Sequence, residues 1–406
     1  MRDMNCIELG DLKIAIGDGN YSSKYPSAAE FVSEGIPFIS SADFEGRIFK
    51  SGEIRRISEE LHNTLQKGHL KKDDILIVVR GNSCGKVGLV PDEYENANIN
   101  AQIAFIRCDN ETINSHFLYY LLETDQYQKR IKMLCTGSAQ PQLPIKNLKK
   151  LVVEVPSYRK QLEIVSIIKD IDEKAYICYL INNNLMEQSN ALFEFFFGKD
   201  LLLNSESFMM SKMKLGDVGL DITDGNYSTK YPAQNEFTEK GVPFIRGADF
   251  DGIGISSKNL IYISAEKHAE LLKGHTKKND ILLTTRGNGV GKVAILSDEF
   301  VDSNLNAQLI RVNGGKKVPR SYLACYFNSH IFQKEIKNMV TGSALPQLPI
   351  GKLKSMDFVL PNKERIDCFD NIIEPIFQLI FANREQIYKL QSMKKKLFMK
   401  LLFEDV

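Results

Sequence analysis

The sequence is short of features that would mark a membrane, secreted or strongly basic protein. No apolar run approaches the roughly 20 residues of a membrane span, and nothing near the N-terminus joins a basic patch to an apolar segment. The seven cysteines are scattered without Cys-x-x-Cys spacing, so neither a disulfide framework nor a zinc site is indicated. The net charge is only +1, so any DNA binding must come from local clusters. We expect a cytoplasmic protein with reduced thiols.

Motifs for catalysis are also missing. A DNA methyltransferase needs a Pro-Pro-containing motif that holds a flipped base, and the chain has no Pro-Pro pair. No acidic cluster is followed by Glu-x-Lys, as a metal-dependent nuclease would require. His69 and His275 lack a second histidine or a carboxylate at ligand spacing, so we expect surface residues rather than metal ligands. We therefore expect a protein that is not an enzyme and holds no metal or cofactor.

Two Gly-Lys turns, at 81–86 and 287–292, raise the alternative of a nucleotide-binding loop. Such a loop needs four residues between its glycines and a Ser or Thr after the lysine. Here there are three residues, and Val87 or Val293 follows the lysine. A β-turn that presents Arg and Lys is the better interpretation, although a duplicated phosphate-handling or nucleotide-handling enzyme stays open as an alternative.

The dominant feature of the chain is an internal repeat. Residues 18–46 and 224–252 share 18 of 29 positions at an offset of 206. The same offset relates 67–76 to 273–282 and 80–87 to 286–293, and after one deletion 136–144 matches 341–349 at an offset of 205. Two repeats of similar length therefore fill the chain.

Each repeat begins with a mixed α/β part. Short β-branched runs such as 75–79 and 87–90, broken by Gly, Asn, Asp and Pro, predict short strands with tight turns. One helix is predicted in each repeat, over 117–133 and 322–339. Each part ends in a strand that a proline stops, at Pro156 and Pro361.

Beyond each of these prolines the pattern changes to a long helix. Apolar residues recur at alternating spacings of four and three, which predicts a heptad seam about 40 residues long in each repeat. The two stripes can pair with each other, or each helix can pack on its own globular part. The predicted seam consists of Ile164, Ile168, Ile171, Asn182, Leu185, Leu192, Ile376, Ile380, Asn383, Ile387, Leu390 and Leu397.

Two polar positions in the seam and one proline bear on how these helices would pair and where the second one would begin. Asn182 and Asn383 are polar residues that can set the register of paired helices at some expense of stability. Pro375 removes a backbone N–H, so we expect the second helix to start near it or to kink there.

A set of polar residues recurs in both repeats at turns. Arg pairs with guanine and Asn or Gln with adenine, while Lys, Ser and Tyr suit phosphate, so these loops could read DNA; solvated turns would look the same. Arg246 stands where the first repeat has Ser40, and marks a possible difference in what is read. The candidate DNA-binding residues are Asn20, Tyr21, Lys24, Arg80, Asn82, Lys86, Asn100, Gln102, Ser138 and Gln142, with Asn226, Tyr227, Lys230, Arg246, Arg286, Asn288, Lys292, Asn306, Gln308, Ser343 and Gln347 in the second repeat.

This organisation resembles the specificity subunits of type I restriction-modification systems. The shared features are the Leu-Gly-Asp starts at 9–11 and 215–217, the Asp-Ile-Leu strands that lead to Gly-Lys-Val, the Pro-Gln-Leu-Pro segments and the strand-proline exits. The resemblance implies an α+β fold with two target-recognition domains and two long helices in an antiparallel coiled coil, related by a pseudo-two-fold axis. The expected parts are recognition domains at 1–156 and 205–361 and spacer helices at 157–204 and 362–406.

The resemblance also implies function and partners. The chain would bind double-stranded DNA at a bipartite, gapped target, nearly palindromic because the modules are so alike, and would position two modification (methyltransferase) subunits and the restriction (translocase) subunits. S-adenosylmethionine and ATP would bind to those partners. The recognition subunit of a type IIB-like enzyme and a structural protein that gathers partners on its helices remain alternatives.

Overall fold

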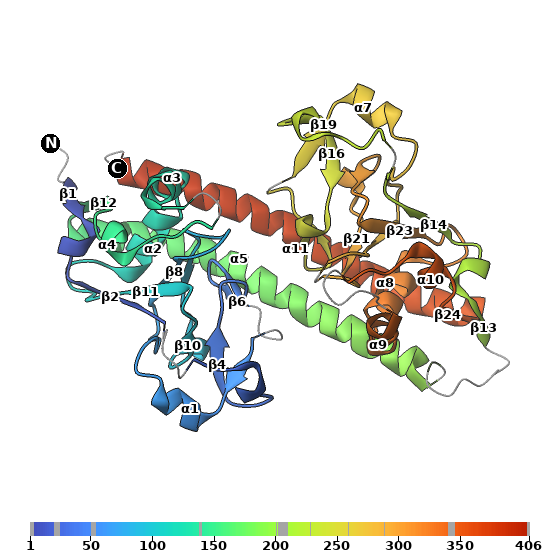
Figure 1. Ribbon diagram of the computed structural model, residues 1–406, viewed down its shortest axis with the longest axis horizontal. Coiled ribbons are helices and arrows are strands. Elements are labelled where there is room, and N and C mark those ends of the chain that lie inside the picture. The colour runs from blue at the N-terminus through green and yellow to red at the C-terminus, as the bar shows by residue number, and fades with distance from the viewer. Residues whose placement is uncertain are drawn as a thin grey trace. The chain divides into compact units, whose positions relative to one another are not determined.

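The computed structural model describes residues 4–19, 25–49, 54–137, 140–199, 201, 210–227, 229–258, 260–287, 289–339 and 346–403. The chain divides into two compact units. Unit 1 comprises Met1–Leu180 and Glu385–Val406, and unit 2 comprises Ile181–Arg384. Each unit therefore contains one globular module together with parts of both long helices (Figure 1).

Unit 1 is built on two small four-stranded sheets. The first sheet is antiparallel, whereas the second contains one parallel pair, β10 with β4. In sheet order, the first has β2 (Ile14–Asp18), β11 (Ile103–Cys108), β8 (Ile75–Val78) and β9 (Val87–Leu89), and the second has β10 (Asn98–Ile99), β4 (Ile36–Ile39), β7 (Arg56–Ile57) and β3 (Phe31–Val32). Two further pairs are β1 (Met4–Glu8) with β12 (Val152–Pro156) and β5 (Phe44–Glu45) with β6 (Ile48–Phe49). The short helices are α1 (Glu59–Thr64), α2 (Ser115–Glu123), α3 (Asp125–Leu134) and α4 (Ile145–Leu148).

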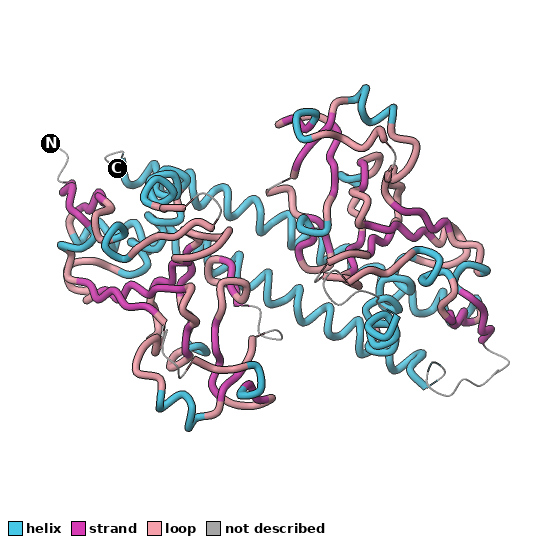
Figure 2. The backbone as a smooth tube through the Cα atoms, viewed as in Figure 1, coloured by secondary structure: helices cyan, strands magenta, loops and turns pink. Residues whose placement is uncertain are grey.

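Unit 2 repeats this topology strand for strand. The first sheet has β14 (Asp221–Asp224), β23 (Leu309–Asn313), β20 (Ile281–Thr284) and β21 (Val293–Ile295), and the second has β15 (Phe237–Thr238), β19 (Ile261–Ile263), β16 (Val242–Ile245) and β22 (Asn304–Leu305). The pairs are β13 (Met210–Lys214) with β24 (Asp357–Pro361) and β17 (Phe250–Asp251) with β18 (Gly254–Ile255). The short helices are α7 (Ala265–Glu270), α8 (Arg320–Asn328), α9 (His330–Met339) and α10 (Ile350–Lys354). In Figure 2 the many short strands stand out in magenta between the loops.

The single helix predicted in each repeat is wrong, because the structure has two short helices there. Thr124 adopts an extended conformation between α2 and α3, and its hydroxyl accepts a hydrogen bond from the backbone N–H of Tyr127. Ser329 is equally extended between α8 and α9 and caps α9 through Phe332 N–H. A Ser or Thr side chain that caps a new helix favours ending the preceding helix at that residue. The apolar periodicity continues through both positions, so it did not indicate where the first helix ends.

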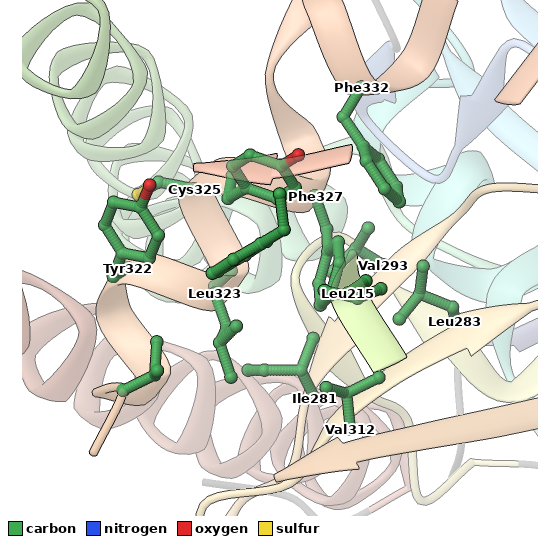
Figure 3. Close-up of a cluster of buried hydrophobic side chains, with 14 of the residues drawn as sticks. Leu215, Ile281, Leu283, Val293, Val312, Tyr322, Leu323, Cys325, Phe327 and Phe332 are labelled. Carbon is green, nitrogen blue, oxygen red and sulfur yellow. The ribbon is translucent and has the colours of Figure 1, made fainter. Parts of the chain in front are cut away.

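The apolar core of each unit lies between the first sheet, the helix pair after it and the long helices. In unit 2, Tyr322, Leu323 and Phe327 of α8 pack with sheet residues such as Ile281 and Val312 (Figure 3). The corresponding core of unit 1 also takes in Phe398 and Leu402, from the end of the last helix. The modules are thus held to the long helices by shared burial of apolar surface.

The long helices are α5 (Tyr158–Phe193), continued by a π-helical turn over Glu194–Gly198, and α11 (Lys363–Phe403). The expectation that the second helix could start near Pro375 is wrong, since α11 begins well before it and includes it. A proline inside a helix removes one hydrogen bond. Ile373 and Phe377, buried in the unit 2 core on either side of it, hold the helix in place.

Within each unit the two long helices run antiparallel. In unit 1, Asp172 contacts Lys394 and Cys178 contacts Gln386, so residue numbers rise on α5 as they fall on α11. In unit 2, Asn182 contacts Asn383 and the later Phe196 contacts the earlier Arg365. The expected α+β fold class with two modules and antiparallel long helices is confirmed.

The residues of the predicted seam differ in how deeply they are buried. Ile164, Ile168, Asn182 and Ile380 are buried. The remaining members are half-buried: Ile171, Leu185, Leu192, Ile376, Asn383, Ile387, Leu390 and Leu397. Among the described residues, no helix has the length and apolarity needed to cross a bilayer.

Candidate nucleic-acid interface

In unit 1, backbone pairing brings three of the candidate segments together at the end of β8. Val79 donates its N–H to Gln102 O at 2.7 Å and accepts from Leu143 N–H at 2.9 Å. Arg80 and Gln142 form an antiparallel bridge, and Gly81 N–H donates to Pro141 O at 3.0 Å. Segments 79–86, 100–102 and 141–143, far apart in sequence, therefore form one loop cluster.

Four polar side chains of this cluster are exposed: Arg80, Asn82, Gln102 and Gln142. They combine one guanidinium with three amides, the groups that can make paired hydrogen bonds to base edges. Backbone hydrogen bonds between the three segments fix where these side chains start, so they stand on a common frame.

Two other candidates in unit 1 point inward. The Lys86 ammonium donates to Ser41 O at 2.7 Å, lies 3.7 Å from Glu45 Oε2 and sits 4.7 Å from the Phe44 ring centre. Asn100 is buried, and its Oδ1 accepts from Gln102 N–H at 3.0 Å. In this structure both side chains shape the loops and do not extend outward.

The Gly-Lys turn is a connection between two strands. Gly81 and Gly85 each have a φ of +91°, a left-handed conformation that glycine adopts without strain. Lys86 is followed by strand β9, whereas a nucleotide-binding loop opens a helix whose N-terminus faces the phosphates. The turn therefore fits the presentation of side chains and does not fit phosphate binding by a loop-helix motif.

Unit 2 assembles the same cluster from its own copies of the segments. Thr285 N–H donates to Gln308 O at 2.8 Å, and Thr285 O accepts from Leu348 N–H at 2.9 Å. Arg286 forms an antiparallel bridge with Gln347. The side chains of Arg286, Gln308 and Gln347 are exposed, as are those of their equivalents in unit 1.

A small pocket of about 90 Å³ lies beside this second cluster. The Arg286 guanidinium sits over the Tyr227 ring at 4.9 Å from its centre, a cation–π arrangement that holds both groups at the rim. Burial raises the pKa of Tyr227, so its hydroxyl keeps its proton and can donate a hydrogen bond. The lining residues are Asp224, Tyr227, Thr285, Arg286, Ile310, Gln347, Leu348, Pro349 and Ile350.

The other described candidates of unit 2 fall into two groups. Lys230 and Lys292 are exposed, as suits contact with phosphate. Asn226 is buried, Asn306 donates to Tyr231 Oη at 3.3 Å, and Arg246 makes hydrogen bonds of 2.7 and 3.1 Å to the two carboxylate oxygens of Asp249. The candidates Asn20, Tyr21, Lys24, Ser138, Asn288 and Ser343 lie outside the described residues.

Sequence reasoning missed two features of unit 2. Asp224 and Thr285 line the pocket. Thr285 belongs to the Thr284-Thr285 pair that replaces Val78-Val79 between the repeats, whereas Asp224 matches Asp18 and no difference between the repeats marks it. Spacing along the sequence indicated no second histidine or carboxylate as a ligand partner of His275, but the structure brings two such groups close to it. His268 and Asp302 lie beside it, although Asp302 is distant in sequence.

Two copies of a mixed α/β module, each with an exposed polar loop cluster and each packed on antiparallel helices, define a duplicated recognition protein. The chain belongs to the family described as the type I restriction modification DNA specificity domain, whose model matches residues 1–185 and 209–388. The two matched segments correspond to the two repeats.

The chain is also similar to individual proteins and to a solved structure. The type I restriction enzyme MjaIX specificity subunit of Methanocaldococcus jannaschii is 22% identical over 420 residues, which cover 100% of this chain and 94% of that protein. The EcoBI specificity subunit of Escherichia coli is 28% identical over 160 residues, 39% of this chain and 33% of that protein. The crystal structure of a type I system S subunit from M. genitalium covers 100% of this chain and 97% of its own, with a TM-score of 0.48 and 16% identity.

Proposed function

We propose that this protein is the DNA-recognition subunit of a type I restriction-modification complex and performs no catalysis itself. The observation that carries the proposal is the duplicated loop cluster, in which Arg80 with Gln142, and Arg286 with Gln347, stand exposed on paired backbone segments. Rigid loops that present arginine and amide side chains are suited to reading base edges in a groove.

Each cluster would read one half of the target. Arg80 and Arg286 would bind guanine through O6 and N7, and the glutamines would bind adenine through N6 and N7. Lys230 and Lys292 would contact phosphate and so set orientation without reading sequence. Arg246, whose guanidinium is engaged by Asp249, would hold its loop rather than contact a base.

The target would be bipartite and gapped. Two similar clusters would read similar half-sites on opposite strands, about one helical turn of DNA or roughly 34–36 Å apart. Differences at the clusters, such as Thr285 in place of Val79, would make the half-sites less than identical.

The partners would supply the chemistry. Two modification subunits would carry S-adenosylmethionine, and restriction subunits would use ATP; the helices α5 and α11 would be the docking surface and spacer, and the complex would act in the cytoplasm. Cognate modification subunits should therefore co-purify with this chain.

The test is to change one cluster at a time. Arg80→Ala and Arg286→Ala should each reduce DNA binding by about 1–3 kcal/mol and relax discrimination at one position of one half-site only. Binding of the full chain with its modification subunits to a library of duplexes, together with methylome sequencing of expressing cells, measures both effects. Lys132→Ala, which removes a positive charge from an exposed site on α3, outside the loop cluster and outside α5 and α11, is the control and should leave the methylated sequence unchanged.

Unaltered affinity and methylation specificity in both cluster variants would remove these arginines from the interface. Two unrelated half-sites in the methylome would contradict the near-palindromic target while leaving the recognition role intact.

A further inference from the structure

Two histidines and an aspartate meet in unit 2 outside the loop cluster. His268 Nε2 lies 3.4 Å and His275 Nδ1 lies 3.8 Å from the same oxygen, Oδ1 of Asp302. All three atoms lie within 4.8 Å of one another. Ligand atoms around a tetrahedral zinc ion with bonds of about 2.0–2.1 Å are roughly 3.3 Å apart. Two of the three separations are thus already close to those of a metal-ligand set.

The remaining ring nitrogens are engaged in the way that metal-binding histidines require. His268 Nδ1 is hydrogen-bonded to Asn304 Oδ1, and His275 Nε2 is hydrogen-bonded to the backbone oxygen of Leu271. Both partners are acceptors, so each of these nitrogens is a donor, and in the neutral form of the ring it is the nitrogen that carries the proton. The lone pairs are then left on His268 Nε2 and His275 Nδ1, the two atoms that face Asp302.

The backbone around the three residues is tied together. Asp302 N–H donates to Thr276 O at 3.0 Å, and Thr276 N–H donates to Ser303 O at 2.9 Å. His275 also forms an antiparallel bridge with Asn304 at the start of β22. These hydrogen bonds place His275 and Asp302 side by side without help from any ion, so the cluster is preorganised.

We propose that His268, His275 and Asp302 bind one divalent transition-metal ion such as Zn²⁺, with water in the fourth position. Two imidazoles and one carboxylate are ligands that zinc accepts, and a tetrahedral site with three protein ligands leaves one place open. The side chain of Asp302 is 75% exposed, which gives an ion access from solvent.

The first module contains a natural control for this site. His62 and His69 repeat the histidine pair, with ring centres 4.4 Å apart against 4.3 Å in unit 2, and His69 Nε2 lies 2.6 Å from Leu65 O. At the place of Asp302, however, the first module has Asn96. Both residues adopt the left-handed conformation, with φ of +63° and +67°, so the backbone is equivalent and only the carboxylate is missing.

The test exchanges these two residues. The untagged, reduced full chain is dialysed with Zn²⁺ near neutral pH, where imidazole is mostly neutral, and the bound metal is counted for wild type, Asp302→Asn and Asn96→Asp. Wild type should bind one more ion than Asp302→Asn, whose affinity should fall at least about tenfold. Asn96→Asp should gain one ion over wild type, because it completes the second histidine pair.

Titration with Co²⁺ gives an independent readout, since its visible absorption reports tetrahedral nitrogen and oxygen ligands. Asparagine and aspartate both tolerate the left-handed turn, so each exchange should preserve the fold, which circular dichroism checks. Equal metal content in wild type and Asp302→Asn would overturn the proposal, as would a histidine pair that stays protonated and paired with Asp302 in the presence of Zn²⁺.

Discussion

The two units pack their long helices with different chemistry at matching places. In unit 1 the buried Lys394 ammonium lies 2.6 Å from Asp172 and 2.7 Å from Glu123. At an offset of 205, unit 2 has Phe377 in place of Asp172 and Ser189 in place of Lys394, both fully buried. One backbone arrangement therefore tolerates charged residues at these buried positions in one unit and uncharged residues in the other.

Unit 2 has a polar contact of its own, further along the helices. Asn383 donates to Asn182 Oδ1 at 2.9 Å, and Asn182 donates to Ile380 O at 3.2 Å. The matching residues in unit 1 are Cys178 and Ile387. The register of the two helices is thus set by an ion pair in unit 1 and by a pair of asparagines in unit 2. A slide of one heptad would bring Lys394 opposite Val165 instead of Asp172 and leave a buried charge without a partner.

The arginine that joins module to helix also differs between the units. In unit 1, Arg47 extends from the module to Glu173 on α5 at 3.0 Å. In unit 2, Arg384 extends from α11 to the module, where it lies 3.3 Å from Asp251 and donates to Ile255 O at 3.2 Å. In unit 1 the arginine thus belongs to the module, and in unit 2 it belongs to the helix. The two repeats share a contact between an arginine and an acidic residue at this place, but not the position of the arginine.

The largest effect is expected from Lys394→Met. The change removes the buried cation that Glu123 and Asp172 share and leaves Asp172 with the longer contact to Arg47, at 3.4 Å. Breaking such a buried cluster reduces the free energy of unfolding by about 3–5 kcal/mol. Hydrogen exchange should show the loss in unit 1 and much less in unit 2. The control is Lys395→Met, whose ion pair with Asp125 is exposed and contributes less than about 1 kcal/mol. Equal effects of both changes would contradict the comparison.

A smaller effect, confined to unit 2, is expected from Asn182→Ala. The change removes the hydrogen bonds to Ile380 O and from Asn383, and should reduce the free energy of unfolding by about 1–2 kcal/mol. Cys178→Ala, in unit 1 at the place that matches Asn383, is the comparison, because its sulfur only approaches Gln386 Oε1 at 3.7 Å. Chemical denaturation of the two variants measures the difference, and a larger loss in Cys178→Ala would reverse the assignment of the polar register contact.

The smallest effect concerns alkaline pH. Burial alone would lower the pKa of Lys394, but Glu123 and Asp172 outweigh burial and hold this pKa above its usual value. A raised lysine pKa contributes stability that is fully present below the unfolded-state pKa of about 10.4 and is lost as the pH rises through the folded-state pKa. The stability difference between wild type and Lys394→Met should therefore be constant from neutral pH to about 10 and shrink above it. A difference that shrinks already near pH 8 would show that Lys394 is not held by its carboxylates.

Much of the fold was readable from the sequence because it follows local rules. The β-branched runs 75–79 and 87–90 became β8 and β9, and the heptad spacing beyond Pro156 and Pro361 became α5 and α11. The failures occurred where a side chain or the surrounding core decides locally. Thr124 and Ser329 start new helices inside an apolar pattern, and buried neighbours carry α11 through Pro375.

The candidate interface was readable in part. The repeat singled out Arg80, Gln102 and Gln142 as recurring polar residues, and the structure assembles all three in one cluster. The sequence could not distinguish these outward-facing side chains from Lys86 and Asn100, which are also polar and also recur in the second repeat. Only the contacts of Lys86 with Ser41 and of Asn100 with Gln102 show that they turn inward.

By itself the sequence determined the absence of catalytic motifs, the duplication, and the long helices, because identity at a constant offset and a period of seven are properties of the chain alone. The tertiary structure decided which polar groups meet. Lys394 pairs with Asp172, Arg80 forms a β-bridge with Gln142, and His275 lies beside Asp302. In each case the two residues are far apart in the sequence, and no regular spacing predicts that they are close in space. Such contacts depend on how strands pair and helices pack, so residues of the same type acquire different roles in two copies of one module.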